Sequence, residues 1–158
     1  MDSDIYSIDK NDNNLDKLSS IVDIQTDDLK KLINYTIKAK EKAYCPYSKF
    51  RVGACLYIKD NPNKFIDGVN IENISYGLSI CAERSALCSA ISNGISIDKL
   101  KTISVCTDKE EFLCPCGACR QFISEFPNLT NIIIINNSGL VKYIKINELI
   151  PYVFKTDL

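Results

Sequence analysis

Four consecutive isoleucines, Ile132 to Ile135, set the strongest constraint on the fold of this chain. Successive side chains of a strand point to opposite faces, so a strand made only of isoleucine must be buried on both faces of its sheet. The segment Leu100–Thr107 also carries apolar residues on both faces. Because helices are what usually cover both faces of such a sheet, the sequence predicts a layered α/β protein.

The other apolar patterns predict helices and strands that alternate along one domain. Their order is α, β-β, α, β, α, β-β, α, which favours a three-layer α/β/α fold with a mixed five-stranded sheet. A length of 158 residues suits a single domain, which we place at residues 26–158. Helices are expected at Thr26 to about Ala43, Cys81–Asn93, Cys116–Phe126 and from near Asn147, and strands at Phe50–Ile58, Lys64–Asn70, Leu100–Thr107, Asn131–Asn136 and Leu140–Ile146.

Residues 1–25 differ in composition from the rest of the chain. They contain six Asp and two Lys, and their apolar residues are too scattered to form a face. Segments of this kind bury too little apolar surface to offset the entropy of ordering. We therefore expect a flexible acidic N-terminal extension that is disordered or loosely docked and lies outside the domain.

The chain has eight cysteines and no histidine, which excludes many enzyme mechanisms. A Ser-His-Asp triad, a Cys-His pair, a His-ligated zinc and a His general base are all impossible. No basic and apolar leader and no membrane-length apolar run is visible, so a cytoplasmic protein with reduced thiols and no membrane partner is expected. The net charge of -1 argues against a large basic surface, so no nucleic-acid partner is expected.

Two cysteine clusters lie where a loop becomes a helix: Cys81-Ala82-Glu83-Arg84 and Pro115-Cys116-Gly117-Ala118-Cys119-Arg120-Gln121. Helix N-termini favour thiolate over thiol, and thiolates bind zinc. Cys116 and Cys119 can grip one face of the ion while Cys81 supplies a third bond. Three protein ligands leave one tetrahedral position for water, which is typical of a catalytic site, and Glu83 can lie beside that water.

Two other interpretations of the cysteines remain open at this point. Cys116 and Cys119 alone could equally form a dithiol redox motif. Cys114 could add a fourth thiol and close the site into a structural Cys₄ zinc centre. The Cys-x-Glu at the second helix start favours the metal over the redox motif. We discount Cys114 because Pro115 stiffens the chain and because Glu83 would then have no partner.

Arginine is used sparingly, and two of the three arginines adjoin these clusters. Zinc with three thiolates carries a formal charge of -1, which weakens its effect on bound water. Guanidinium groups that donate to the sulfurs offset this charge. We assign this role to Arg84, and with less weight to Arg120, since either side chain could instead form a surface ion pair.

These motifs resemble those of cytidine deaminases of the small, three-cysteine zinc class. The Cys₃ zinc set with a non-ligand Glu and a P-C-x-x-C element is the signature of zinc deaminases. The likeness runs in order from about Thr26 to the C-terminus. It also includes Tyr47-Ser48-Lys49-Phe50-Arg51-Val52-Gly53-Ala54, Asn70-Ile71-Glu72-Asn73 with Tyr76, and Glu148-Leu149-Ile150-Pro151 with Phe154.

The resemblance implies hydrolytic deamination of cytidine and 2′-deoxycytidine in pyrimidine salvage, with one Zn²⁺ per subunit. It implies that Glu83 carries protons, that Asn70 and Glu72 bind the ribose, and that Phe50 stacks on the pyrimidine. The ligands it implies are Cys81, Cys116 and Cys119. It further implies a homotetramer whose active sites are completed by neighbouring subunits, to which Tyr76 and Phe154 contribute.

Overall fold

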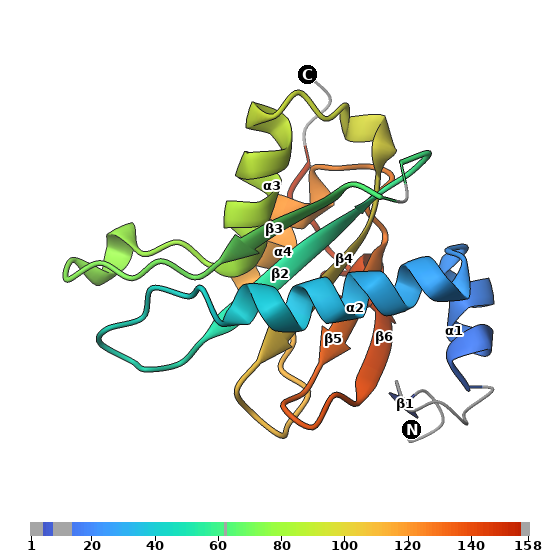
Figure 1. Ribbon diagram of the computed structural model, residues 1–158. Helices are drawn as coiled ribbons and strands as arrows, with labels where there is room; N and C mark the ends of the chain where they lie inside the picture. The colour runs from blue at the N-terminus through green and yellow to red at the C-terminus, as the bar shows by residue number, and fades with distance from the viewer. Residues whose placement is uncertain (1–4, 8–13, 62, 156–158) are drawn as a thin grey trace.

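The protein is a single mixed β-sheet with helices on both faces (Figure 1). The structure, a computed structural model, describes residues 5–7, 14–61 and 63–155. The strand order is β1-β6-β5-β4-β2-β3, in which β4 and β5 are parallel and every other pair is antiparallel. The predicted three-layer fold with a mixed sheet is confirmed. In the described part of the chain, no helix is long and apolar enough to cross a membrane.

The helices and strands mostly follow the predicted segments. The helices are α1 (Asn14–Val22), α2 (Thr26–Lys40), α3 (Ala82–Ser92), α4 (Gly117–Ser124) and α5 (Ile146–Leu149), and short 3₁₀ helices span Tyr76–Leu78 and Ile97–Lys99. The strands are β1 (Ile5–Tyr6), β2 (Val52–Ile58), β3 (Phe65–Val69), β4 (Leu100–Thr107), β5 (Asn131–Ile135) and β6 (Val141–Lys145).

The isoleucine run lies in β5, and its side chains pack in two separate hydrophobic cores. Ile132 and Ile134 pack with α3 and α4 on one face of the sheet. Ile133 and Ile135 pack with α1 and α2 on the other face. All four side chains are fully buried, so both helical layers are held against the sheet largely by this strand and its neighbour β4.

The N-terminal segment corrects two expectations. Ile5 and Tyr6 form β1, which pairs with β6 and gives the sheet six strands instead of five. Leu15, Leu18 and Val22 of α1 are buried against α2 and the sheet. Three apolar residues on one helical face, although surrounded by Asp and Asn, bury enough surface to dock the helix. Of the two alternatives expected for residues 1–25, disorder or docking, the described part is docked on the domain.

Two glycines allow helices to lie unusually close to the sheet. A Cβ atom at Gly53 in β2 would lie 2.4 Å from the backbone N of Lys40 in α2. A Cβ atom at Gly68 in β3 would lie 2.2 Å from the backbone N of Ala86 in α3. Any larger residue would push these helices away. The close approach of α3 to β3 sets the distance of its first turn from the sheet, and this turn lies at the candidate site.

Candidate active site

The two cysteine clusters meet where α3 and α4 begin. Cys81 is the residue before α3, and Cys116 is the residue before α4. The sulfur atoms of Cys81, Cys116 and Cys119 all lie within 4.8 Å of one another, and the first two are 3.9 Å apart. The fold thus brings Cys81 next to Cys116, which lies 35 positions later in the sequence, at the N-termini of two helices.

The spacing of these sulfurs fits a zinc ion. A Zn–S bond of about 2.3 Å in tetrahedral geometry places two ligand sulfurs about 3.8 Å apart. The distance between the Cys81 and Cys116 sulfurs is 3.9 Å, close to that value. Cys114 is exposed and lies outside this group of three. Three thiol ligands leave one coordination position for water, as catalytic zinc sites do.

The protonation of the free thiols follows from their surroundings. The hydrogen bond from Cys119 and the guanidinium of Arg84 lower the pKa of Cys81 to about 5. The same hydrogen bond, together with burial, raises the pKa of Cys119. Cys81 is therefore the first of the two to ionise, and Cys119 keeps its proton until a metal displaces it.

Glu83 lies in the first turn of α3, two residues after Cys81. Its side chain is almost completely buried, at 4 % exposure, and burial raises the pKa of its carboxyl group. It also lines the same cavity as Cys81 and Cys116. A raised pKa makes a carboxyl group better able to take up a proton and return it to a bound substrate.

The two arginines of the clusters have different partners. Nη2 of Arg84 lies 3.8 Å from the Cys81 sulfur and donates to the carbonyl of Ser79 at 3.4 Å. Arg120 instead donates to the backbone carbonyls of Pro115 at 2.7 Å and Leu149 at 3.1 Å. Arg84 is thus placed to offset thiolate charge. Arg120 braces the loop that carries Cys116.

Cys81, Cys116 and Glu83 line a cavity of about 690 Å³. This volume falls within the range of pockets that hold small molecules. Four of the residues expected to bind substrate, Phe50, Asn70, Glu72 and Tyr76, line this cavity. The cavity is large enough for a nucleoside.

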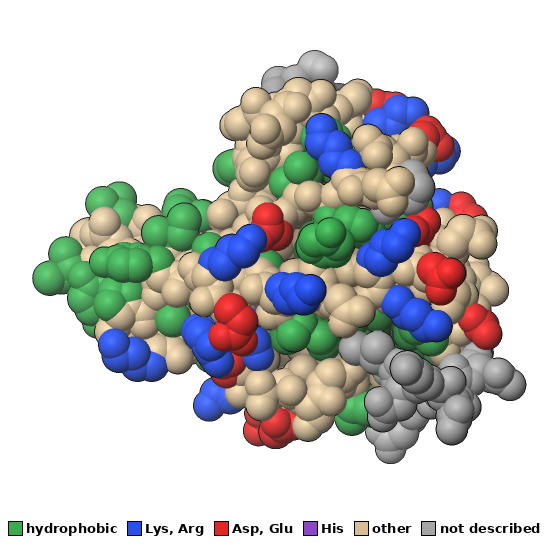
Figure 2. Space-filling view, in the orientation of Figure 1, with side chains coloured by type: hydrophobic (Ala, Val, Ile, Leu, Met, Phe, Trp, Pro, Cys, Tyr) green, Lys and Arg blue, Asp and Glu red, His purple; other side chains and the backbone are tan. Residues whose placement is uncertain are grey.

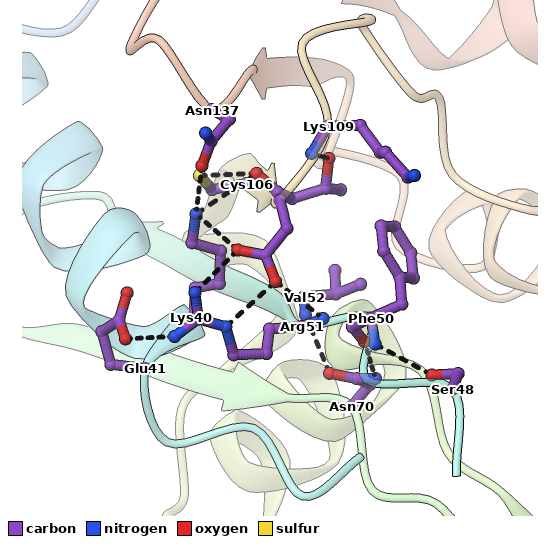
Figure 3. A network of polar contacts seen from close by, with 12 residues as sticks. Lys40, Glu41, Ser48, Phe50, Arg51, Val52, Asn70, Cys106, Lys109 and Asn137 are labelled. Carbon is purple, nitrogen blue, oxygen red and sulfur yellow. Dashed lines mark hydrogen bonds and ion pairs between the residues drawn. The ribbon is translucent and has the colours of Figure 1, made fainter. Parts of the chain in front are cut away.

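Asn70 and Glu72 also make structural contacts that the sequence did not reveal. The Asn70 amide accepts from the backbone N of Val52 and donates to the backbone carbonyl of Phe50, both at 2.8 Å (Figure 3). Glu72 accepts from the backbone N of Tyr47 at 2.9 Å and from the Ser48 hydroxyl. The hydrogen bond from Ser48 is the largest of the interactions that lower the pKa of Glu72. The Glu72 carboxylate is therefore ionised at neutral pH.

Phe154 lies away from this cavity. Its ring is 77 % exposed, while its backbone is held by the side-chain amide of Gln121 in α4 through hydrogen bonds of 2.8 and 3.1 Å. The structure therefore does not bring Phe154 to the sulfurs within one chain. Gln121 presents the aromatic ring outward.

Sequence reasoning missed the part of the cavity wall that the sheet provides. Val105 and Thr107 line the cavity at the carboxyl end of β4. Ligands of α/β proteins often bind at the carboxyl ends of parallel strands, and β4 and β5 are the parallel pair. This strand end was therefore a signal that could have located both residues.

The fold and the site together define a class of zinc enzyme: three thiols at two helix N-termini, a buried carboxylate and a cavity between them. The family model for the cytidine and deoxycytidylate deaminase zinc-binding region matches residues 26–135. The chain therefore belongs to the cytidine and deoxycytidylate deaminase family. The matched region contains all three cysteines of the group that could hold a metal ion.

Relatives and solved structures of high similarity support this assignment. A cytidine deaminase of Halalkalibacterium halodurans is 44% identical over 131 residues, which cover 82% of this chain and 96% of the relative. A cytidine deaminase of Sporosarcina psychrophila is 42% identical over 133 residues, covering 83% and 95%. A crystal structure of cytidine deaminase from Burkholderia pseudomallei matches with TM-score 0.73 and 41% identity, covering 78% of this chain and 97% of that one.

Proposed function

We propose that this protein is a zinc-dependent cytidine deaminase, which converts cytidine and 2′-deoxycytidine to the uridine forms and ammonia. The observation that carries this proposal is a group of three cysteine sulfurs at one end of a nucleoside-sized cavity, which Cys81, Cys116 and the buried Glu83 line. A catalytic zinc ion acts as a Lewis acid and lowers the pKa of bound water to about 7. Cys81, Cys116 and Cys119 are the proposed ligands of one zinc per chain.

Glu83 is the proposed proton carrier of the reaction. Its carboxylate accepts a proton from the attacking water and delivers it to N3 of the cytosine ring. It then takes the proton of the hydroxyl now on C4, which becomes the carbonyl of uridine, and passes that proton to the amino group, which leaves as ammonia. Cytidine and water thereby become uridine and ammonia. Because the one carboxylate serves both transfers, the chain needs no histidine.

The cavity wall supports recognition of a nucleoside. Phe50 offers an aromatic face for the pyrimidine ring, and Asn70 and Glu72 offer polar atoms for the sugar hydroxyls. The Asn70 amide retains one N–H that its two backbone contacts do not use. We assign these three residues to substrate binding.

Ionised Glu72 predicts selectivity against phosphorylated substrates. The negative charge of Glu72 on the cavity wall repels a 5′-phosphate. Its carboxylate oxygens can still accept hydrogen bonds from sugar hydroxyls. We expect kcat/KM for CMP at least about 100-fold below that for cytidine, equivalent to about 2.7 kcal/mol. Parallel assays with cytidine, 2′-deoxycytidine, CMP and single-stranded DNA measure this. Equal turnover of cytidine and CMP would contradict the assignment of a nucleoside substrate.

We also infer a homotetramer with active sites shared between subunits. An apolar arm, which carries Ile71, Ile74, Tyr76, Leu78 and Ile80 beside Tyr44 and Tyr47, projects from the domain with every one of these side chains exposed (Figure 2). Contiguous apolar surface of this kind is typical of protein interfaces. Tyr76 lines the cavity from this arm, so a neighbour seated on the arm would also border the active site.

Replacing Ile74 with Asp is expected to dissociate the assembly. Ile74 is 80% exposed on the apolar arm, and a buried unpaired charge would weaken any interface formed there. Light scattering coupled to size exclusion measures the mass. Ile97→Asp is the control and should leave the mass unchanged. Ile97 is also exposed and apolar, but it lies just before the first residue of β4, away from the apolar arm. A wild-type monomer would refute the inferred tetramer.

The remaining assignments concern the chain as a whole. We infer that the deaminase domain is residues 26–158, because the family match begins at residue 26. Residues 1–25 are then an extension whose described part docks on this domain. All eight cysteines are free, which supports a reducing compartment, and we place the protein in the cytoplasm.

A further inference from the structure

We propose that Asp108 is a positioning residue for nucleoside binding: its carboxylate gathers Arg51 and Lys40 and thereby holds the backbone segment 50–52 in the cavity wall. Asp108 itself does not line the cavity. It acts through Arg51, whose two chain neighbours do. This inference rests on the proposed function of the site.

The Asp108 carboxylate receives four donors from two other residues, Arg51 just before β2 and Lys40 at the end of α2. The backbone N and Nε of Arg51 donate to Oδ2 at 3.1 and 3.0 Å, and Nη2 of Arg51 donates to Oδ1 at 3.0 Å. Nζ of Lys40 lies 3.1 Å from Oδ1. Two-point contact between a guanidinium and a carboxylate fixes both position and orientation. The end of β4, the start of β2 and the end of α2 are thus tied to one side chain.

Lys40 makes this arrangement difficult to rearrange. It is 5% exposed, and its ammonium group has three acceptors: Asp108, the carbonyl of Thr107 at 3.3 Å and the amide oxygen of Asn137 at 3.2 Å. An ammonium group has three donors, so every one is used. Loss of the Asp108 charge would leave a buried cation without its counter-ion, which is costly.

The network bears on the cavity because of what flanks Arg51. Phe50 and Val52 both line the cavity, and so does Thr107, the residue before Asp108. Asn70 bonds the carbonyl of Phe50 and the backbone N of Val52, while Asp108 bonds the backbone N and side chain of Arg51. Figure 3 shows Phe50, Arg51 and Val52 together with Lys40 and Asn70 in this network of polar contacts. Consecutive residues are therefore fixed by two separate side chains.

The charge on Asp108 persists throughout the working pH range. Burial alone would raise its pKa, but hydrogen bonds from Arg51 and Lys40 outweigh burial and hold the pKa at about 2. The network therefore acts as a fixed brace at neutral pH.

Asp108→Asn tests the proposal because it keeps the shape of the side chain and removes its charge. We expect KM for cytidine to rise about 10-fold while kcat and zinc content stay within about 2-fold of wild type. Calorimetric titration with uridine should show a parallel rise in Kd and does not depend on turnover. Asp60→Asn is the matched control, because Asp60 pairs with Lys99 at the exposed surface, 2.8 Å away. This variant should leave KM unchanged.

The outcomes separate this inference from the proposed function. Wild-type protein that holds zinc but does not deaminate cytidine refutes the proposed function. Active wild type with an unchanged KM and Kd in Asp108→Asn refutes the positioning role, even if the melting temperature falls. If Asp108→Asn does not fold, Arg51→Lys is the variant used to test the positioning role. It keeps a positive charge, loses the two-point contact, and should raise KM in the same direction.

Discussion

Glu83→Gln is expected to abolish deamination while the protein keeps its zinc and its fold. Glutamine has nearly the same shape as glutamate but cannot accept and return a proton. Removal of a general acid–base group lowers kcat by about 10²–10⁴-fold, and here one group serves both proton transfers, so the upper end is expected. Glu83 is not a proposed zinc ligand, and its amide replacement still fits the buried position at 4 % exposure.

Steady-state assays and metal analysis of the same sample measure this effect. Glu125→Gln, at an exposed position after α4, removes one carboxylate elsewhere and should behave as wild type. Normal cytidine turnover by Glu83→Gln would rule out Glu83 as the proton carrier. Loss of zinc in that variant would instead assign Glu83 a role in holding the metal.

Cys116→Ser is expected to remove zinc and activity together, whereas Cys114→Ser should keep both. The two positions form a matched pair, because both thiols are exposed and only Pro115 separates them. Only Cys116 belongs to the group of three sulfurs. Loss of a residue that merely orients a ligand costs about 10–100-fold in metal affinity, so loss of a ligand itself should cost more.

Zinc content per chain after dialysis separates the competing interpretations of the cysteines. Zinc loss in Cys114→Ser would indicate a closed Cys₄ structural site. A metal-free protein that reduces disulfides through Cys116 and Cys119 would indicate a dithiol oxidoreductase. The three-ligand account predicts about one zinc per chain in Cys114→Ser and wild type and almost none in Cys116→Ser.

The layered fold could be predicted because its strongest signals are local. The isoleucine run Ile132 to Ile135 alone specifies a strand buried on both faces, and the structure divides it between two cores. The N-terminal strand could not be predicted in this way. Ile5 and Tyr6 make a two-residue strand that pairs with β6, more than 130 residues away in the sequence.

The candidate site shows the same division between local and distant information. The spacing of Cys116 and Cys119, and of Cys81 and Glu83, could be read directly because each pair lies within one helix turn. Asp108 contacts Lys40 and Arg51, and even the nearer of the two, Arg51, lies 57 positions before it in the sequence. No local pattern encodes such a meeting, because it depends on how β2, β4 and α2 pack.

The most direct test of the account is the fate of cytidine incubated with the purified, zinc-loaded protein. Ultraviolet absorbance follows the loss of cytidine, and ammonia is measured in the same sample. The account predicts conversion to uridine with one ammonia released per uridine formed. Unchanged cytidine in the presence of folded protein that holds one zinc per chain would contradict it.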